Sequence, residues 1–129
     1  MLKKRLGVAG AEIDWYNVKG SLGDYFKVSS TLIIPVNCVK VGRQAFWGCD
    51  EIKKVIIPES VKEIGRSAFN LCKNLKEVRI PWSVVEIGDW AFCDCKKATI
   101  ILEKPMSEFK YIGPYAFLGC KDVKEENRG

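Results

Sequence analysis

The sequence predicts a right-handed α/β solenoid of about four 23-residue coils, with short strands on a concave face and short helices or turns on a convex face. One motif recurs along the chain, and its Ala-Phe pairs begin at residues 45, 68, 91 and 116, which gives spacings of 23, 23 and 25 residues. Each copy also carries an apolar, strand-like segment ahead of its Ala-Phe pair. A fixed period of this size is typical of coils that bury their apolar faces only against neighbouring coils.

Residues 1–31 do not match the motif, although they contain four large aromatic side chains, at Trp15, Tyr16, Tyr25 and Phe26. The first coil of a solenoid exposes an apolar edge, and atypical terminal segments cover such edges. We therefore expect residues 1–31 to form an N-terminal cap or a degenerate first coil, followed by repeats over residues 32–123.

The copy from residue 55 to residue 77 shows how one coil is built. Val55 and Ile57 are two residues apart, as in a short strand with one buried face, and Pro58 ends the strand because it lacks a backbone donor. Val61 and Ile64 supply two further inward anchors. The next segment, SAFNLC, is too short for a stable free helix and suits one or two turns on the convex side.

Two repeat positions predict how the coils stack. A glycine follows the last anchor in every copy, as Gly65 follows Ile64, which indicates either a positive φ or a close approach between coils. The phenylalanines of successive copies, Phe46, Phe69 and Phe92, are expected to stack into an aromatic spine.

The fourth copy departs from the pattern. Its strand is expected at residues 99–102, the usual Ile-Pro is missing, and Glu103 falls in the position of Ile80 unless the register shifts by about one residue. Residues 124–129 form a C-terminal tail without an evident apolar cap. Either residues 121–129 fold over the last coil, or this strand edge meets another chain, or the chain is a piece of a longer array; an uncovered edge favours association.

Four of the six cysteines fall three residues after a repeat phenylalanine and form one repeat position: Cys49, Cys72, Cys95 and Cys120. Stacking at ~4.8 Å would allow disulfides, but a column of small buried thiols is the favoured interpretation. A linear column of thiols without histidine fits a tetrahedral zinc site poorly, so no metal site is expected.

Composition excludes several functions. The chain has no histidine, its net charge is +5, and it shows neither a nucleophile-base pair nor a glycine-rich phosphate loop, so an enzyme is not expected. Apolar runs are too short to span a bilayer, so no membrane insertion is expected. The N-terminal apolar stretch is shorter than a signal peptide requires, which favours a cytoplasmic location unless the chain is a fragment of a surface protein.

The candidate binding site comes from the outward positions of the strands, because solenoids usually bind on the concave face. Lys54 and Ile56 alternate with buried Val55, and the same phase places Thr31, Ile33, Glu77 and Arg79 outward, with Leu102 in the last copy. Trp82 follows Pro81 and has the composition of an interface anchor, or else covers the neighbouring coils. The predicted partner-binding residues are Lys54, Ile56, Glu77, Arg79 and Trp82.

Two further surfaces are weaker candidates. Trp47, Trp90 and Tyr115 lie around the Ala-Phe segments, either as an exposed aromatic patch or as a shield over the spine. Lysines recur at the turns and would align into a ridge, but acidic residues interleave with them. A mixed solvated edge is therefore favoured over a nucleic-acid site.

Strand-Ile-Pro, Val-x-x-Ile-Gly-x-x-Ala-Phe and Cys-x-x-Leu at this period resemble the BspA-like leucine-rich repeats, over residues 32–123. The resemblance implies a leucine-rich-repeat solenoid that binds protein partners, in some members during adhesion, without catalysis or cofactor. The expected function is thus protein–protein interaction through the concave face. The alternative is a structural module that self-associates or forms arrays through its C-terminal edge.

Overall fold

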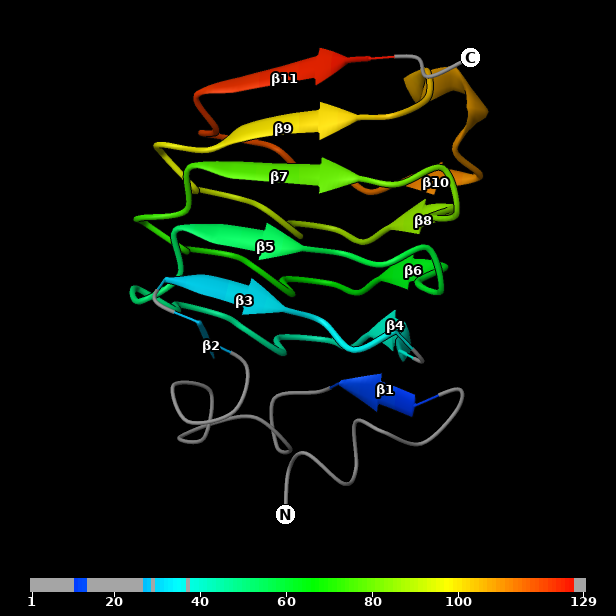
Figure 1. Ribbon diagram of the computed structural model, residues 1–129. Helices are drawn as coiled ribbons and strands as arrows, with labels where there is room; N and C mark the ends of the chain where they lie inside the picture. Colours follow the sequence, from blue (N-terminus) through cyan, green and yellow to red (C-terminus); the bar gives the residue numbers. More distant parts are fainter. Residues whose placement is uncertain (1–10, 14–26, 29, 37, 127–129) are drawn as a thin grey trace.

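The computed structural model describes residues 11–13, 27–28, 30–36 and 38–126, which form a stack of similar coils with two parallel-stranded sheets along its length (Figure 1). Sheet A consists, in spatial order, of β1 (Ala11–Ile13), β4 (Cys38–Val41), β6 (Glu63–Ile64), β8 (Glu86–Ile87) and β10 (Tyr111–Ile112). Sheet B consists of β11 (Asp122–Glu125), β9 (Thr99–Leu102), β7 (Glu77–Ile80), β5 (Lys54–Ile56), β3 (Thr31–Ile33) and β2 (Lys27–Val28). Among the described strands, only β2 pairs antiparallel, with β3. The predicted solenoid is confirmed.

The coils that begin with β3, β5 and β7 each contribute one strand to sheet B and, after a proline turn, a two- to four-residue strand to sheet A. Pro58 follows strand β5 and prevents the strand from continuing. Val61 and Ile64 are then buried in the core, as predicted. Register between coils is set by this alternation, because a slip of one residue would turn every buried side chain outward.

The third side of the stack, which we call the turn face, consists of turns rather than helices. The backbone N–H groups of Gln44, Phe46 and Gly48 donate to carbonyl groups of the next coil, at 2.8–2.9 Å. Two residues in each coil have left-handed backbone conformations, with φ between 56° and 81°, and this conformation interrupts a helix. They are Gln44, Ser67, Trp90 and Tyr115 at one position, and Gly48, Leu71, Asp94 and Gly119 at the other. Within the described residues, the single helix is the 3₁₀ turn η1 (Met106–Glu108).

The core runs along the axis of the stack. The predicted phenylalanine spine is present: ring centroids lie 5.3 Å apart for Phe46 and Phe69, 5.1 Å for Phe69 and Phe92, and 6.0 Å for Phe92 and Phe117. The first three rings are fully buried. Such stacking adds about 1 kcal/mol per pair to the free energy gained by burying the rings.

The recurring glycine is explained by close approach rather than by a positive φ. A Cβ atom at Gly65 would lie 2.9 Å from the carbonyl oxygen of Val41, and one at Gly88 would lie 2.5 Å from the amide nitrogen of Arg66. Both neighbouring atoms belong to the backbone of the preceding coil, which cannot move aside easily. Glycine at this position therefore sets how closely the coils stack.

The cysteine column is a set of thiols. The Sγ atoms of Cys72, Cys95 and Cys120 donate to the carbonyl oxygens of the phenylalanines one coil earlier, at 3.2, 3.0 and 3.1 Å. None of the six cysteines, all of which lie in the described part of the chain, forms a disulfide, and Cys72 and Cys95 are fully buried. The column thus supplies a side-chain hydrogen bond to the backbone of each preceding coil.

The last coil corrects one prediction. Leu102 was expected to face outward, but it pairs with Ile80 in the register of β7 with β9 and is fully buried. The outward residue is Ile101, which pairs with Arg79. The reason is a one-residue deletion. One residue, Lys76, separates Leu75 from Glu77, whereas Ala98 is followed directly by Thr99, the residue paired with Glu77.

Both ends of the repeat region carry additional strands. Strand β1 pairs in parallel with β4, and β2 pairs with β3. The aromatic residues predicted to form the cap (Trp15, Tyr16, Tyr25 and Phe26) lie outside the described residues, so the cap of residues 1–31 stays a prediction. At the other end, β11 forms a fifth step of sheet B and crosses the predicted boundary between residues 123 and 124.

Candidate functional site

The outward side chains of sheet B, which we call the sheet B face, form two columns. The first column contains Thr31, Lys54, Glu77, Thr99 and Asp122, which are paired from strand to strand. The second contains Ile33 and Ile56, paired with one another, and then Arg79, Ile101 and Lys124. Ile33 and Ile56 are 43% and 45% exposed. Ile101, in the same column, is only 9% exposed. The open apolar part of this face is therefore the pair Ile33 and Ile56, and five of the other side chains are charged.

A groove of about 260 Å³ lies on this face, and we call it the sheet B groove. Four of the five predicted partner-binding residues line it: Lys54, Ile56, Glu77 and Arg79. The remaining lining residues are Val55, Ile57, Glu59, Pro81 and Glu103. The alternation of buried and outward residues, which the sequence predicts, thus brings these four side chains together.

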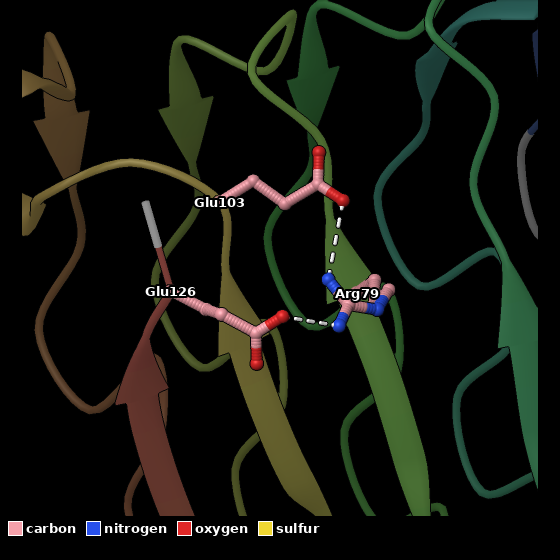
Figure 2. Close-up of polar contacts among 3 residues, drawn as sticks. All are labelled: Arg79, Glu103 and Glu126. Carbon is pink, nitrogen blue, oxygen red and sulfur yellow. Dashed lines mark hydrogen bonds and ion pairs between the residues drawn. The ribbon is translucent and has the colours of Figure 1, made fainter. Parts of the chain in front are cut away.

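Arg79 is held by two carboxylates (Figure 2). Its Nη1 atom lies 3.4 Å from Oε2 of Glu103, and its Nη2 donates to Oε1 of Glu126 at 2.5 Å. The hydrogen bond to Glu126 raises the pKa of Arg79 above its ordinary value, and Glu103 adds to this effect. The guanidinium group therefore bridges strand β7 to the residues that follow β9 and β11.

Both carboxylates occupy the position that proline holds in the earlier coils. Glu103 follows Leu102, which pairs with Ile80, so that Glu103 corresponds to Pro81. Its backbone N–H donates to the carbonyl oxygen of Ile80 at 3.1 Å, a hydrogen bond that proline cannot make. Glu126 repeats this one coil later and donates to the carbonyl oxygen of Leu102 at 2.7 Å. Replacing proline with glutamate thus lengthens the ladder and supplies two partners for Arg79.

The charge of the groove is negative on balance. Three carboxylates line it, at Glu59, Glu77 and Glu103, against the cations Lys54 and Arg79. Glu103 is only 6% exposed, and Arg79 offsets its charge while also holding Glu126. Glu59 and Glu77 are the other two carboxylates of the lining, beside the exposed side chain of Ile56.

Trp82 lies outside the groove, at the turn that leads from sheet B to sheet A. It is 37% exposed. The Nζ atom of Lys104 donates to its carbonyl oxygen at 3.1 Å and lies 5.8 Å from its ring and 4.5 Å from the ring of Phe109. Burial lowers the pKa of Lys104, whose side chain is enclosed between these two rings. Trp82 therefore covers the next coil with part of its surface and remains open with the rest.

The residues that sequence reasoning missed are Glu103, Glu126 and Lys104. A signal for the first was present, because shifting the register by one residue aligns Leu102 and Glu103 with Ile80 and Pro81. Glu126 and Lys104 lie in segments without clear repeat identities, so their positions depend on the strand pairing.

Metal-ligating side chains do not cluster in the described part of the chain. No group of three or more side chains of the metal-ligating types lies within reach of one ion there. None of the described residues forms a long apolar helix of the kind that crosses a bilayer.

The lysine ridge is a second charged region. Lys76, Lys96, Lys97 and Lys121 surround a hollow of about 350 Å³ together with Thr99. Thr99 is paired with Glu77 on one side and Asp122 on the other, so that carboxylates flank the hollow. The edge is therefore mixed in charge, as the interleaved sequence predicts.

Comparison with known proteins agrees with this architecture. The sequence profile described as "BspA type Leucine rich repeat region (6 copies)" matches residues 25–127. No curated protein matches the chain significantly in sequence.

Among solved structures, a leucine-rich repeat protein from T. pallidum is similar, with a TM-score of 0.58 and 20% identity over 74% of this chain and 58% of that one. A leucine-rich cell surface protein from Faecalibacterium prausnitzii A2-165 has a TM-score of 0.53 and 17% identity over 74% of this chain and 32% of that one. The chain thus spans less than two thirds of the length of either protein, and the likeness concerns the fold. Because the family profile covers nearly the whole chain, the protein belongs to the BspA-type leucine-rich repeat family.

Proposed function

We propose that the chain is a non-enzymatic module that binds a partner protein through the sheet B groove. The observation that carries this proposal is the convergence of Lys54, Ile56, Glu77 and Arg79 on one groove at the open apolar pair of the sheet B face. Exposed apolar side chains within a charged rim are typical of protein interfaces. The family and its cell-surface relative support a protein-interaction role of the adhesion type.

The chemistry of the groove defines the partner further. Ile33 and Ile56 offer an apolar surface, and Glu77 offers a carboxylate beside it. A partner segment with an apolar side chain next to lysine or arginine would match both features. Trp82, in the turn that follows strand β7, is proposed as a secondary contact at the margin of the interface.

A pair of matched variants tests this proposal. Ile56→Asp places a charge in the groove, and Val85→Asp places the same charge at a side chain of similar exposure (39%) that does not line the groove. We expect a partner retained by the wild-type chain to be lost with Ile56→Asp and retained with Val85→Asp. Equal retention by all three proteins would place the interface elsewhere.

The alternative is self-association through the last strand of sheet B. Strand β11 carries charged side chains at Asp122, Lys124 and Glu125, and charges on an edge strand oppose pairing with another strand. Light scattering over a range of concentrations separates the two candidates. A constant monomeric mass would remove self-association, and a mass that rises with concentration would support it.

A further inference from the structure

A second hollow, of about 400 Å³, lies on the turn face, away from sheet B, and we call it the turn-face hollow. Two arginines and two tryptophans dominate its lining, which also includes small polar residues and one carboxylate. The lining residues are Arg43, Gln44, Trp47, Arg66, Ser67, Asn70, Leu71, Trp90, Cys93 and Asp94.

The hollow exists because one coil has smaller side chains than its neighbours. Asn70 stands at the repeat position that Trp47 holds one coil earlier, and Ser67 at the position that Trp90 holds one coil later. The floor is fixed, since Nδ2 of Asn70 donates to Oγ of Ser67 at 3.4 Å. Trp47 and Trp90 therefore lie in the coils on either side of the smaller, polar side chains of Ser67 and Asn70.

One wall of the hollow is rigid. The guanidinium carbon of Arg66 lies 4.9 Å from the ring centroid of Trp90, and this ring stacks on Tyr115 at 6.1 Å with an interplanar angle of 8°. The guanidinium group of Arg66 is thus oriented by stacking on the ring of Trp90, a contact that arginine commonly makes with tryptophan. Such a group loses little conformational freedom when it binds a ligand.

The two arginines, Arg43 and Arg66, occupy the same repeat position in consecutive coils. Each directly follows the recurring glycine of its coil, Gly42 or Gly65. Coils in parallel register place them about 4.8 Å apart at their backbones. In the part of the chain that the structure describes, no carboxylate forms an ion pair with Arg43 or Arg66. Two adjacent guanidinium groups without such partners attract a ligand with negative charge.

We propose that the turn-face hollow binds an extended acidic segment of a partner protein. Two guanidinium groups face a single lining carboxylate, Asp94, so that the hollow favours one or two carboxylates. In an extended peptide, alternate side chains point to the same side about 7 Å apart, a distance that two long arginine side chains can match. The segment's neighbouring side chains would pack between Trp47 and Trp90.

Two observations favour this occupant over nucleic acid and this place over the lysine ridge. Asp94, within the hollow, and Asp89, on the same repeat position as the arginines, repel a chain of phosphates more strongly than an isolated carboxylate. The lysines of the ridge are exposed and strongly hydrated, whereas guanidinium groups bind carboxylates through two parallel hydrogen bonds. The proposal is independent of the sheet B groove.

The test uses a fluorescently labelled peptide, Ser-Gly-Glu-Ser-Glu-Ser-Gly, and the same peptide with glutamine in place of glutamate. Binding to the whole chain is followed by fluorescence anisotropy at low salt. We expect the glutamate peptide to bind and the glutamine peptide to bind at least about tenfold more weakly. Arg43→Gln should weaken the glutamate peptide about tenfold, and Arg43→Lys should restore only part of the loss.

Two control variants and one alternative ligand complete the experiment. Lys121→Gln removes one positive charge from the ridge, and Ile56→Asp alters the sheet B groove; neither should change the affinity for the glutamate peptide by more than about twofold. An equal loss with Lys121→Gln and Arg43→Gln would overturn the proposal, as would absence of binding by the glutamate peptide at millimolar concentration. A thymidine oligonucleotide of ten bases that binds more tightly than the glutamate peptide, with loss in Arg43→Gln, would identify nucleic acid as the occupant instead.

Discussion

Arg79 and Glu103 form an ion pair across one step of sheet B, and Glu103 stands where the earlier coils have proline. The same guanidinium group holds Glu126, one step further along the stack. Three successive coils are therefore joined on their outer face by one arginine (Figure 2). The position is also a wall of the sheet B groove, so that the groove's shape depends on the pairing of the last strands.

Arg79→Gln should loosen the last coil. The substitution leaves the largely buried carboxylate of Glu103 without its cation and removes the bond that fixes Glu126. We expect a lower melting temperature and faster amide hydrogen exchange in β11. Lys54→Gln, on the same face and without an ion pair among the described residues, is the control. Unchanged exchange in β11 would show that the strand pairing alone holds this segment.

Gly88→Ala should destabilise the protein by about 3 kcal/mol, because the added methyl group meets the backbone of the preceding coil. Gly48→Ala is a comparison with a different cause, since the site has open space but a φ of 68°. It should cost about 1 kcal/mol. Urea unfolding measures the loss of unfolding free energy in both variants. A larger loss with Gly48→Ala than with Gly88→Ala would contradict close stacking at Gly88.

The thiols of the cysteine column should react slowly with a thiol reagent in the folded chain. The neighbouring thiol of Cys95 raises the pKa of Cys120, and burial raises it further, so that little thiolate is present near pH 8. We expect a thiol reagent to modify Cys120 at least about tenfold more slowly in the folded chain than in urea. All six thiols should then titrate in urea without prior reduction. A smaller number would reveal disulfides along the column.

Tyr111 should give a defined pH dependence. Its hydroxyl donates to Oδ1 of Asp89 at 2.6 Å, and this hydrogen bond raises the pKa of Tyr111. The contribution to stability is thus complete below the unfolded value of about 10 and is lost as pH rises through the higher folded pKa. The difference in unfolding free energy between the wild type and Tyr111→Phe should stay constant up to pH 9 and shrink above it. A difference that grows with pH would contradict the hydrogen bond.

The sequence predicts the regular coils well because their physics repeats. Alternation around Val55, proline at the strand end and phenylalanine at a fixed period each have one favourable arrangement in a stack of coils. The same alternation is sufficient to place Lys54, Ile56, Glu77 and Arg79 on one face.

The remaining features depend on properties that no single copy shows. The left-handed residues at Ser67 and Leu71 are neither glycine nor asparagine, so their conformation follows from the hydrogen bonds of neighbouring coils. The deletion after Ala98 moves Leu102 inward, and only the pairing of β7 with β9 reveals it. The turn-face hollow likewise arises from a difference between coils, at Ser67 and Asn70.

The most direct test of the account is a quantitative comparison of partners captured from extracts of the source organism and of cells in its surroundings. Wild type, Ile56→Asp and Val85→Asp are immobilised side by side after circular dichroism has shown that all three are folded. The account predicts at least one protein retained by the wild type and Val85→Asp and depleted at least about tenfold with Ile56→Asp. Partners held equally by Ile56→Asp and the wild type would contradict binding through the sheet B groove.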